Sequence, residues 1–148
     1  MYLCLTVGFP GCGKSTWANQ QAAAEPKLVL VSRDDIRATI RPEGTWNFDE
    51  RTNRDDEALV TLIQRNMVIL ALSQGRPVIV HNTNLYPWQY ADLLEVADKC
   101  GAEVRYQSFL DVPIEECIRR DAPRPGWRRV GAERLRKMHE SWSLAQGK

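Results

Sequence analysis

The chain has 148 residues, 43% of them apolar and 26% charged, and 20 lysines and arginines against 19 acids give a formal net charge of +1. This length and composition are typical of one globular domain and exclude a disordered chain or a second catalytic domain. The near-zero charge argues against a strongly basic protein that coats nucleic acid. No apolar run is long enough to span a membrane and the start lacks the basic region of a signal peptide, so we expect a cytosolic protein without a membrane partner.

The first forty residues predict a strand–helix–strand–helix unit. An uncharged apolar run over residues 2–7 is typical of a buried strand. A glycine-rich turn (8–13) and a helix (14–25) follow, and the helix ends before a proline. A second strand (27–32) leads into a short helix (33–40).

The middle of the chain repeats this alternation. A loop (41–49) precedes a long helix (50–74), and a glycine at position 75 ends that helix. Helical spacing predicts that its buried face comprises Leu59, Leu62, Ile63, Met67 and Leu70. A short apolar strand (78–80) follows, and then a helix that begins at Pro87 and ends near Gly101.

The last third predicts one more strand (102–110) and a helix capped by Asp111, with Pro113 in its first turn. A loop rich in arginine, proline and glycine (121–131) and an amphipathic helix (132–144) complete the chain. The alternation predicts an α/β domain with a parallel sheet of four to five strands and helices on both faces. Ligands bind such folds at the carboxyl ends of the strands.

The strongest motif follows the first strand, where residues 8–15 match GxxxxGK[ST] in full. Glycines allow backbone N–H groups to approach phosphates, Lys14 reaches the β- and γ-phosphates, and Ser15 is a ligand for Mg²⁺. Cys12 is either a spacer or a reactive thiol at the helix N-terminus. The predicted nucleotide-binding residues are Gly8, Phe9, Pro10, Gly11, Cys12, Gly13, Lys14, Ser15 and Thr16.

The segment after the second strand, Ser-Arg-Asp-Asp-Ile-Arg, lies where an acceptor substrate belongs. A kinase needs a carboxylate to take the proton of the attacking hydroxyl, and Asp34 is placed for that role. Arg37 is one turn later on the same face, whereas Asp35 is expected to face elsewhere. The alternative is a capping aspartate with a solvated ion pair.

No carboxylate follows the third strand, where an acid often helps to hold Mg²⁺. His81 stands there, and we expect a buried histidine with its hydrogen bonds satisfied. The next three residues, Asn82, Thr83 and Asn84, either line the acceptor site or turn the chain. We therefore expect Ser15 to bind the metal ion directly and Asp34 to bind it through a water molecule.

The region 118–137 carries eight basic and two acidic residues. Its cations predict a lid that closes over the phosphates of ATP, since proline and glycine disfavour a helix in the loop. We expect Arg124 to stabilise the transition state, with Arg120 as the second candidate. Trp127 either stacks on a base or packs against the hinge of the lid.

Together, GFPGCGKST, VSRDDIR, NTNL, DVP and the arginine-rich loop resemble the kinase domain of the phage-type 5′-polynucleotide kinases over essentially the whole chain. The resemblance implies a single P-loop kinase domain (1–148) that transfers the γ-phosphate of ATP, with Mg²⁺, to 5′-hydroxyl ends of DNA or RNA. It implies Asp34 as general base, Arg37 on the acceptor's 3′-phosphate, Lys14 and Ser15 on ATP and Mg²⁺, and Arg124 on the ATP phosphates. It also implies a role in nucleic-acid end healing and repair, in the host cytoplasm for a phage enzyme.

The chain departs from that family in one position. Family members carry an aspartate beside the NTN segment, whereas this chain has His81 and Asn82. From the length we expect 5′-phosphorylation alone, without the phosphatase domain of some family members, and a homo-oligomer stays open.

Two other functions stay open on the residues alone. One is a small-molecule P-loop kinase acting on a sugar, antibiotic or nucleoside, and the other is an NTP-dependent binding module. The Asp34–Arg37 pairing argues against the binding module, and the arginine-rich region favours a polynucleotide acceptor over a small one. The acidic stretch 43–57 balances the basic region, which explains the neutral total and suggests that any nucleic-acid contact is local.

Overall fold

A computed structural model describes residues 1–42 and 54–147. The described part contains one parallel sheet of four strands in the order β2-β3-β1-β4. These are β1 (Tyr2–Val7), β2 (Val29–Val31), β3 (Val78–Val80) and β4 (Glu103–Ser108). The parallel pairings confirm the predicted α/β class with four strands.

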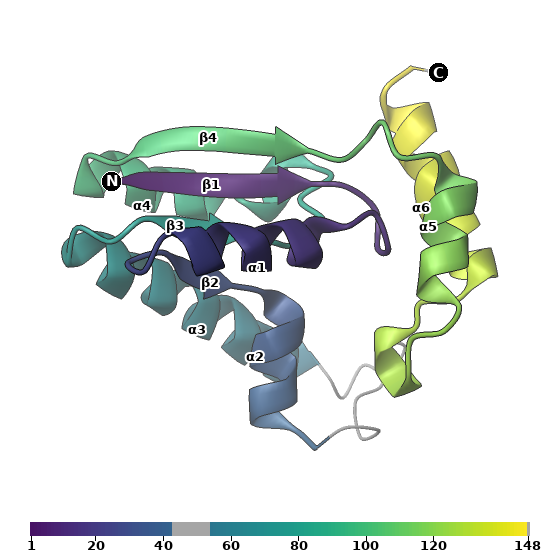
Figure 1. Ribbon diagram of the computed structural model, residues 1–148, viewed down its shortest axis with the longest axis horizontal. Helices are drawn as coiled ribbons and strands as arrows, with labels where there is room; N and C mark the ends of the chain where they lie inside the picture. Colours follow the sequence, from purple (N-terminus) through teal and green to yellow (C-terminus); the bar gives the residue numbers. More distant parts are fainter. Residues whose placement is uncertain (43–53, 148) are drawn as a thin grey trace.

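The α-helices are α1 (Lys14–Ala24), α2 (Arg33–Ile40), α3 (Arg54–Ser73), α4 (Ala91–Cys100), α5 (Ile114–Asp121) and α6 (Ala132–Ala145). Two short 3₁₀ helices are η2 (Pro87–Gln89) and η3 (Gly126–Arg128). Figure 1 shows α1 on one face of the sheet and α3 and α4 on the other, as predicted. Helices α5 and α6 lie together beyond the carboxyl ends of the strands, and α2 begins at the end of β2. No described helix combines the length and apolarity needed to cross a bilayer.

The alternation of side chains along β1 builds a core on each face of the sheet. Leu3 and Leu5 are fully buried and pack with residues of α3 and α4. Cys4, between them, points to the other face and packs with Ala18 of α1. A third cluster, centred on Phe9, joins the turn after β1 to α5 and α6. The turn is therefore clamped between the sheet and the C-terminal helices.

The predicted buried face of α3 is wrong in part. Leu59, Leu62 and Leu70 are exposed, although Ile63 and Met67 contact the core. The buried positions are instead Val60, Gln64, Val68, Ala71 and Leu72. The sequence carries apolar residues on more than one side of this helix, and only packing against β2, β3 and α4 decides between them. Gln64 is buried because its amide takes part in a polar network described below.

Two predicted helix starts are also wrong. Pro87 begins the 3₁₀ helix η2, and α4 starts only at Ala91. Helix α5 has Pro113 at its N-cap and no side-chain cap, so Asp111 does not cap it. The predicted start of the long helix at residue 50 and most of the loop 41–49 lie outside the described residues.

Candidate active site

The GxxxxGKS segment forms the turn between β1 and α1, as its motif predicts. Gly11 and Gly13 have φ values of 84° and 101°, a region that suits glycine. The Gly8 N–H donates to the Thr83 carbonyl at 2.9 Å, which ties the turn to the segment after β3. The Lys14 ammonium is buried and donates to the Gly8 and Phe9 carbonyls at 2.9 and 2.8 Å, and burial lowers its pKa.

Cys12 is buried within this turn, and its Sγ accepts a hydrogen bond from the Lys14 ammonium at 3.4 Å. A reactive thiol needs access to solvent, which this side chain lacks. The geometry therefore favours the spacer role over the reactive one.

Gly11 cannot be replaced by a larger residue without strain, because its φ is positive and a neighbouring backbone leaves no space for a Cβ. This gives a first testable prediction. A Cβ at Gly11 would lie 2.4 Å from the Cys117 carbonyl oxygen, a backbone atom of α5. We expect Gly11→Ala to abolish ATP binding by displacing the turn from α5, with binding measured by calorimetry. The matched control is Gly75→Ala, because Gly75 has a φ of 72° and no atom within 4 Å of the added Cβ.

Both substitutions should lower the free energy of unfolding by about 1–2 kcal/mol for the left-handed backbone alone. Only Gly11→Ala should lose ATP binding. Normal ATP affinity in folded Gly11→Ala protein would show that the turn does not bind nucleotide as described.

Ser15 and His81 face each other where β3 ends. The Ser15 hydroxyl lies 3.1 Å from His81 Nδ1, and His81 is buried. Burial lowers the pKa of His81, although the carboxylate of Asp35 opposes this. His81 Nε2 has no hydrogen-bond partner in the described part of the chain and lies 3.9 Å from Asp35 Oδ2. The expectation of a fully satisfied histidine is therefore wrong, since one ring nitrogen is unpaired.

The start of α2 presents the predicted carboxylate and arginine side by side. Ser32 caps the helix by accepting a hydrogen bond from the Asp35 N–H at 3.1 Å. Arg37 donates to Asp34 Oδ1 at 2.7 Å, so the two share a face as expected. Asp34 is half exposed, whereas the Arg37 side chain is largely buried. A carboxylate and a guanidinium thus lie together at the carboxyl end of β2.

Glu57 of α3 completes this cluster, and no sequence motif predicts its place there. Its carboxylate accepts hydrogen bonds from Arg37 at 2.8 and 3.1 Å and from Arg33 at 2.7 Å. Burial raises the pKa of Glu57, but these two arginines outweigh burial and hold the pKa below its ordinary value. Twenty residues separate Glu57 from Arg37, so no local spacing marks the pair.

Asp35 does not face away from the site, contrary to the expectation. Its carboxylate lies 3.9 Å from His81 Nε2 and 3.4 Å from the Arg128 guanidinium. Arg128 belongs to η3, so this contact joins α2 to the arginine-rich loop across the site. The approach of that loop to α2 could not be read from spacing along the chain.

The segment after β3 has one buried residue, Asn84, and two half-buried residues, Asn82 and Thr83. Asn84 is buried, has a φ of 43° and donates to the Thr6 carbonyl at 2.9 Å, which supports its alternative role in turning the chain. Asn82 accepts from the Arg33 N–H at 2.9 Å and donates to Gln64 at 2.7 Å. Thr83 is half-buried and lines the cavity described next.

The arginine-rich loop (121–131) is held at its base by Asp121. This buried carboxylate accepts hydrogen bonds from the Val130 and Gly131 N–H groups at 3.0 and 2.8 Å. The Arg124 guanidinium lies 3.7 Å from the same carboxylate. Trp127 packs against the hydrophobic core, and Arg128 lies 4.9 Å above its ring.

One cavity of about 360 Å³ brings the predicted groups together. Its lining includes Lys14 and Ser15 from α1, Asp34 and Arg37 from α2, and Arg124 from the loop. Arg124 also lines a neighbouring cavity with Arg120, which lies over Gly11, Gly13 and Thr16. We call the first of these the reaction cavity. In the described part of the chain no group of three histidine, cysteine, aspartate or glutamate side chains is arranged to hold a metal ion.

The fold and this cavity define the class: an α/β P-loop domain of the kinase type. The chain belongs to the AAA_33 family, whose model is described as an AAA domain and matches residues 3–144. Nucleotide binding and a kinase-like phosphotransferase architecture follow from the P-loop, the fold and the family together.

Two similar solved structures contain a Pnkp1/Rnl/Hen1 complex, one of them described as an RNA repair complex. The matched chains are 28% and 25% identical, with TM-scores of 0.68 and 0.71 over 80% and 95% of this chain. This chain spans only 38% and 45% of their length. The matches support the resemblance to a polynucleotide kinase-type P-loop domain.

More distant structures share the fold alone. A putative kinase from Chloroflexus aurantiacus is 18% identical, with a TM-score of 0.65 over 82% of this chain and 67% of that one. The APS kinase CysC of Mycobacterium tuberculosis, solved with AMPPNP and APS, is 17% identical, with a TM-score of 0.58 over 82% of this chain and 69% of that one.

Proposed function

We propose that residues 1–148 form one kinase domain that transfers the γ-phosphate of ATP, or another NTP, to 5′-hydroxyl ends of DNA or RNA. The observation that carries the proposal is the single cavity that joins Lys14 of the P-loop, the Asp34–Arg37 pair and Arg124. The similarity to chains of an RNA repair complex supports a nucleic-acid acceptor. A 5′-phosphorylating role in nucleic-acid repair follows from this proposal.

The donor binds at the P-loop, where backbone N–H groups and the start of α1 favour phosphate oxygens. Lys14 exchanges its hydrogen bonds to the Gly8 and Phe9 carbonyls for bonds to the β- and γ-phosphates. Arg120 and Arg124, which line a cavity with Gly11, Gly13 and Thr16, contact the donor phosphates.

The residues present fit a bound Mg²⁺. In the neutral tautomer with its proton on Nε2, His81 would accept a hydrogen bond at Nδ1 from the Ser15 hydroxyl, 3.1 Å away, and this would leave lone pairs of the Ser15 oxygen for a cation. Mg²⁺ bound to nucleotide phosphates keeps several waters, so it needs few protein ligands. Ser15 would hold the ion directly and Asp34 through water, and the ion would neutralise charge on the β- and γ-oxygens.

In the transfer step, Asp34 takes the proton of the acceptor 5′-hydroxyl. The hydroxyl oxygen forms a bond to the γ-phosphorus, and the bond from that phosphorus to the β–γ bridging oxygen breaks. The products are the 5′-phosphorylated end and the nucleoside diphosphate. Arg124 stabilises the charge on the transferring group.

Arg37 supplies a prediction about the acceptor. We expect Arg37→Ala to lower kcat/KM by about 10- to 100-fold more for an acceptor with a 3′-phosphate than for a nucleoside without one, because a hydrogen bond to a charged group is lost. Steady-state kinetics on the two acceptors measure the difference. Arg41→Ala is the matched control, since Arg41 pairs with Asp56 in a similar bridge between α2 and α3.

Equal losses on both acceptors would mean that Arg37 only supports Asp34 and does not bind the 3′-phosphate. The Arg41→Ala control should leave the ratio between acceptors unchanged.

Salt dependence separates a polynucleotide acceptor from a small one. For a single-stranded acceptor, log affinity should fall with log salt by about 0.7 per phosphate contacted. We therefore expect KM for a 5′-hydroxyl oligonucleotide to rise more steeply with salt than KM for a nucleoside 3′-monophosphate. Identical slopes would favour the small-molecule kinase instead.

A further inference from the structure

A second cavity, of about 640 Å³, adjoins the reaction cavity. The two share Arg33, Asn82, Thr83 and Gln89 in their linings. A ligand in the second cavity therefore lies next to the cavity that Asp34 lines. Its size falls within the range of small-molecule sites.

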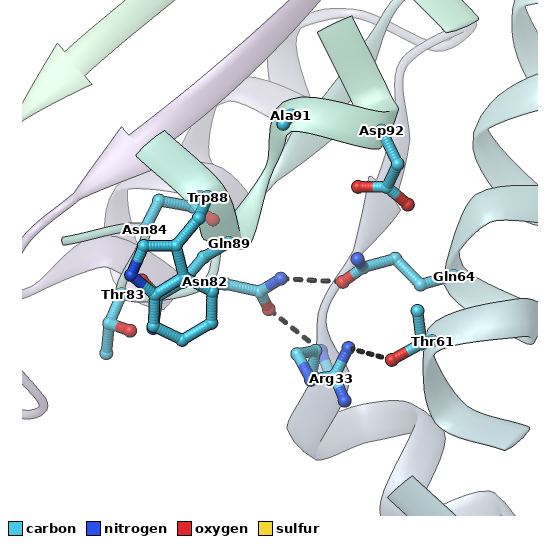
Figure 2. Close-up of a pocket in the computed structure, with 10 residues that line it drawn as sticks. All are labelled: Arg33, Thr61, Gln64, Asn82, Thr83, Asn84, Trp88, Gln89, Ala91 and Asp92. Carbon is cyan, nitrogen blue, oxygen red and sulfur yellow. Dashed lines mark hydrogen bonds between the residues drawn. The ribbon is translucent and has the colours of Figure 1, made fainter. Parts of the chain in front are cut away.

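One wall of this cavity is an exposed indole. Trp88, in η2, is 74% exposed and stacks on Tyr86 with ring centroids 6.0 Å apart and an interplanar angle of 12°. Figure 2 shows the indole on one side of the cavity, with Thr61 and Gln64 on the other. An aromatic face presented to a cavity is suited to stacking on a planar ring.

The opposite wall presents oriented polar groups. Asn82 donates to the Gln64 oxygen at 2.7 Å, so the Gln64 amide nitrogen is left for another acceptor. The Asp92 carboxylate lines the same cavity and has no hydrogen-bond or ion-pair partner within residues 1–42 and 54–147. The wall therefore offers both a donor and an acceptor for a ligand with mixed hydrogen-bonding edges.

The charges of the two cavities differ. Arg37, Arg124 and Arg128 line the reaction cavity, which suits phosphates. The one arginine of the second cavity, Arg33, also lines the reaction cavity and pairs with Glu57 at 2.7 Å, and Asp92 adds negative charge to the second cavity alone. The second cavity therefore favours an uncharged planar group over a phosphate.

We propose that the second cavity binds the nucleobase of the acceptor's 5′-terminal nucleoside, stacked on Trp88 and hydrogen-bonded to Gln64 and Asp92. This inference rests on the proposed function, because it assigns the acceptor its position beside Asp34. In this arrangement the 5′-hydroxyl lies at Asp34 and the 3′-phosphate at Arg37, both in the reaction cavity, while the base lies against Trp88 in the second cavity.

The test compares two oligonucleotides that differ only in their 5′-terminal residue, one with a normal base and one abasic. Stacking contributes about 5- to 150-fold per base, so we expect kcat/KM of the unaltered protein to favour the base-bearing end by that factor. Trp88→Ala should reduce the ratio to near one, and Trp88→Phe should keep most of it. Asp92→Asn should slow only the base-bearing acceptor.

Tyr106→Ala is the control, because Tyr106 is a half-exposed aromatic residue on β4 that lines neither cavity. It should leave the ratio unchanged. An unaltered protein that phosphorylates both ends equally, or a Trp88→Ala variant that slows both equally, would overturn the base site and leave the proposed function standing. A protein that phosphorylates neither end but does phosphorylate a sugar would overturn both.

Discussion

Asp34→Asn should lower kcat by about 10²- to 10⁴-fold, the range for loss of a general base. The amide keeps the shape of the side chain but cannot take the proton of the acceptor hydroxyl. ATP affinity should stay nearly unchanged, because Asp34 lines the reaction cavity from α2 and the P-loop comes from the other side. Single-turnover transfer and calorimetric ATP binding separate the two effects.

The matched control is Asp35→Asn, in the same turn of α2. Its carboxylate is as exposed as that of Asp34 and contacts Arg128 and His81 rather than Arg37. We expect a much smaller loss of kcat from Asp35→Asn. A near-wild-type rate for Asp34→Asn, or equal losses from both variants, would exclude Asp34 as the base.

Arg124→Ala should lower kcat by about 10³-fold, the lower end of what an arginine on the transferring phosphoryl group contributes. Arg124 lines the reaction cavity with Lys14 and Ser15, and Asp121 lies 3.7 Å from its guanidinium. The effect should fall on kcat more than on the affinity for ATP, because the charge it stabilises develops during transfer. Arg124→Lys should recover part of the rate, since the charge stays but the planar fork is lost.

Arg119→Ala is the control for Arg124. Arg119 belongs to the same basic region, is largely exposed and pairs with Glu116 on its own helix. It lines none of the cavities around the P-loop. Removal of this charge should leave kcat within twofold. Comparable losses from the two substitutions would point to the total charge of the region rather than to one positioned guanidinium.

The parts of the fold that sequence predicts well are those built by local rules. The uncharged run of β1 and the glycines after it determine a strand followed by a phosphate-binding turn, and both are present. Ser32 caps α2 through its own side chain, so the placement of Asp34 and Arg37 on one face follows from helical spacing.

The parts that sequence could not predict depend on tertiary contacts. Glu57 reaches Arg37 only because α3 packs on α2, and Asp35 meets Arg128 across 93 residues. The buried side of α3 includes Gln64 rather than the exposed leucines, because Gln64 bonds to Asn82 at the end of β3. Distant pairs of this kind leave no periodic signal along the chain.

Asp121 illustrates the same limit within the arginine-rich loop. It is buried and hydrogen-bonds to two backbone N–H groups at the far end of the loop, nine and ten residues later. In the sequence, this acid is only one of two that partly offset the eight basic residues of the region 118–137. These hydrogen bonds join the two ends of the loop that contains Arg124.

The most direct measurement of the central claim is transfer of labelled γ-phosphate from ATP to a panel of acceptors. The panel contains 5′-hydroxyl DNA, 5′-hydroxyl RNA, nucleoside 3′-phosphates and simple sugars. We predict label at the 5′ ends of the oligonucleotides, lost in Asp34→Asn, with little or none on the sugars. Transfer to a sugar in preference to every 5′-hydroxyl end, or release of inorganic phosphate without any transfer, would contradict the proposed function.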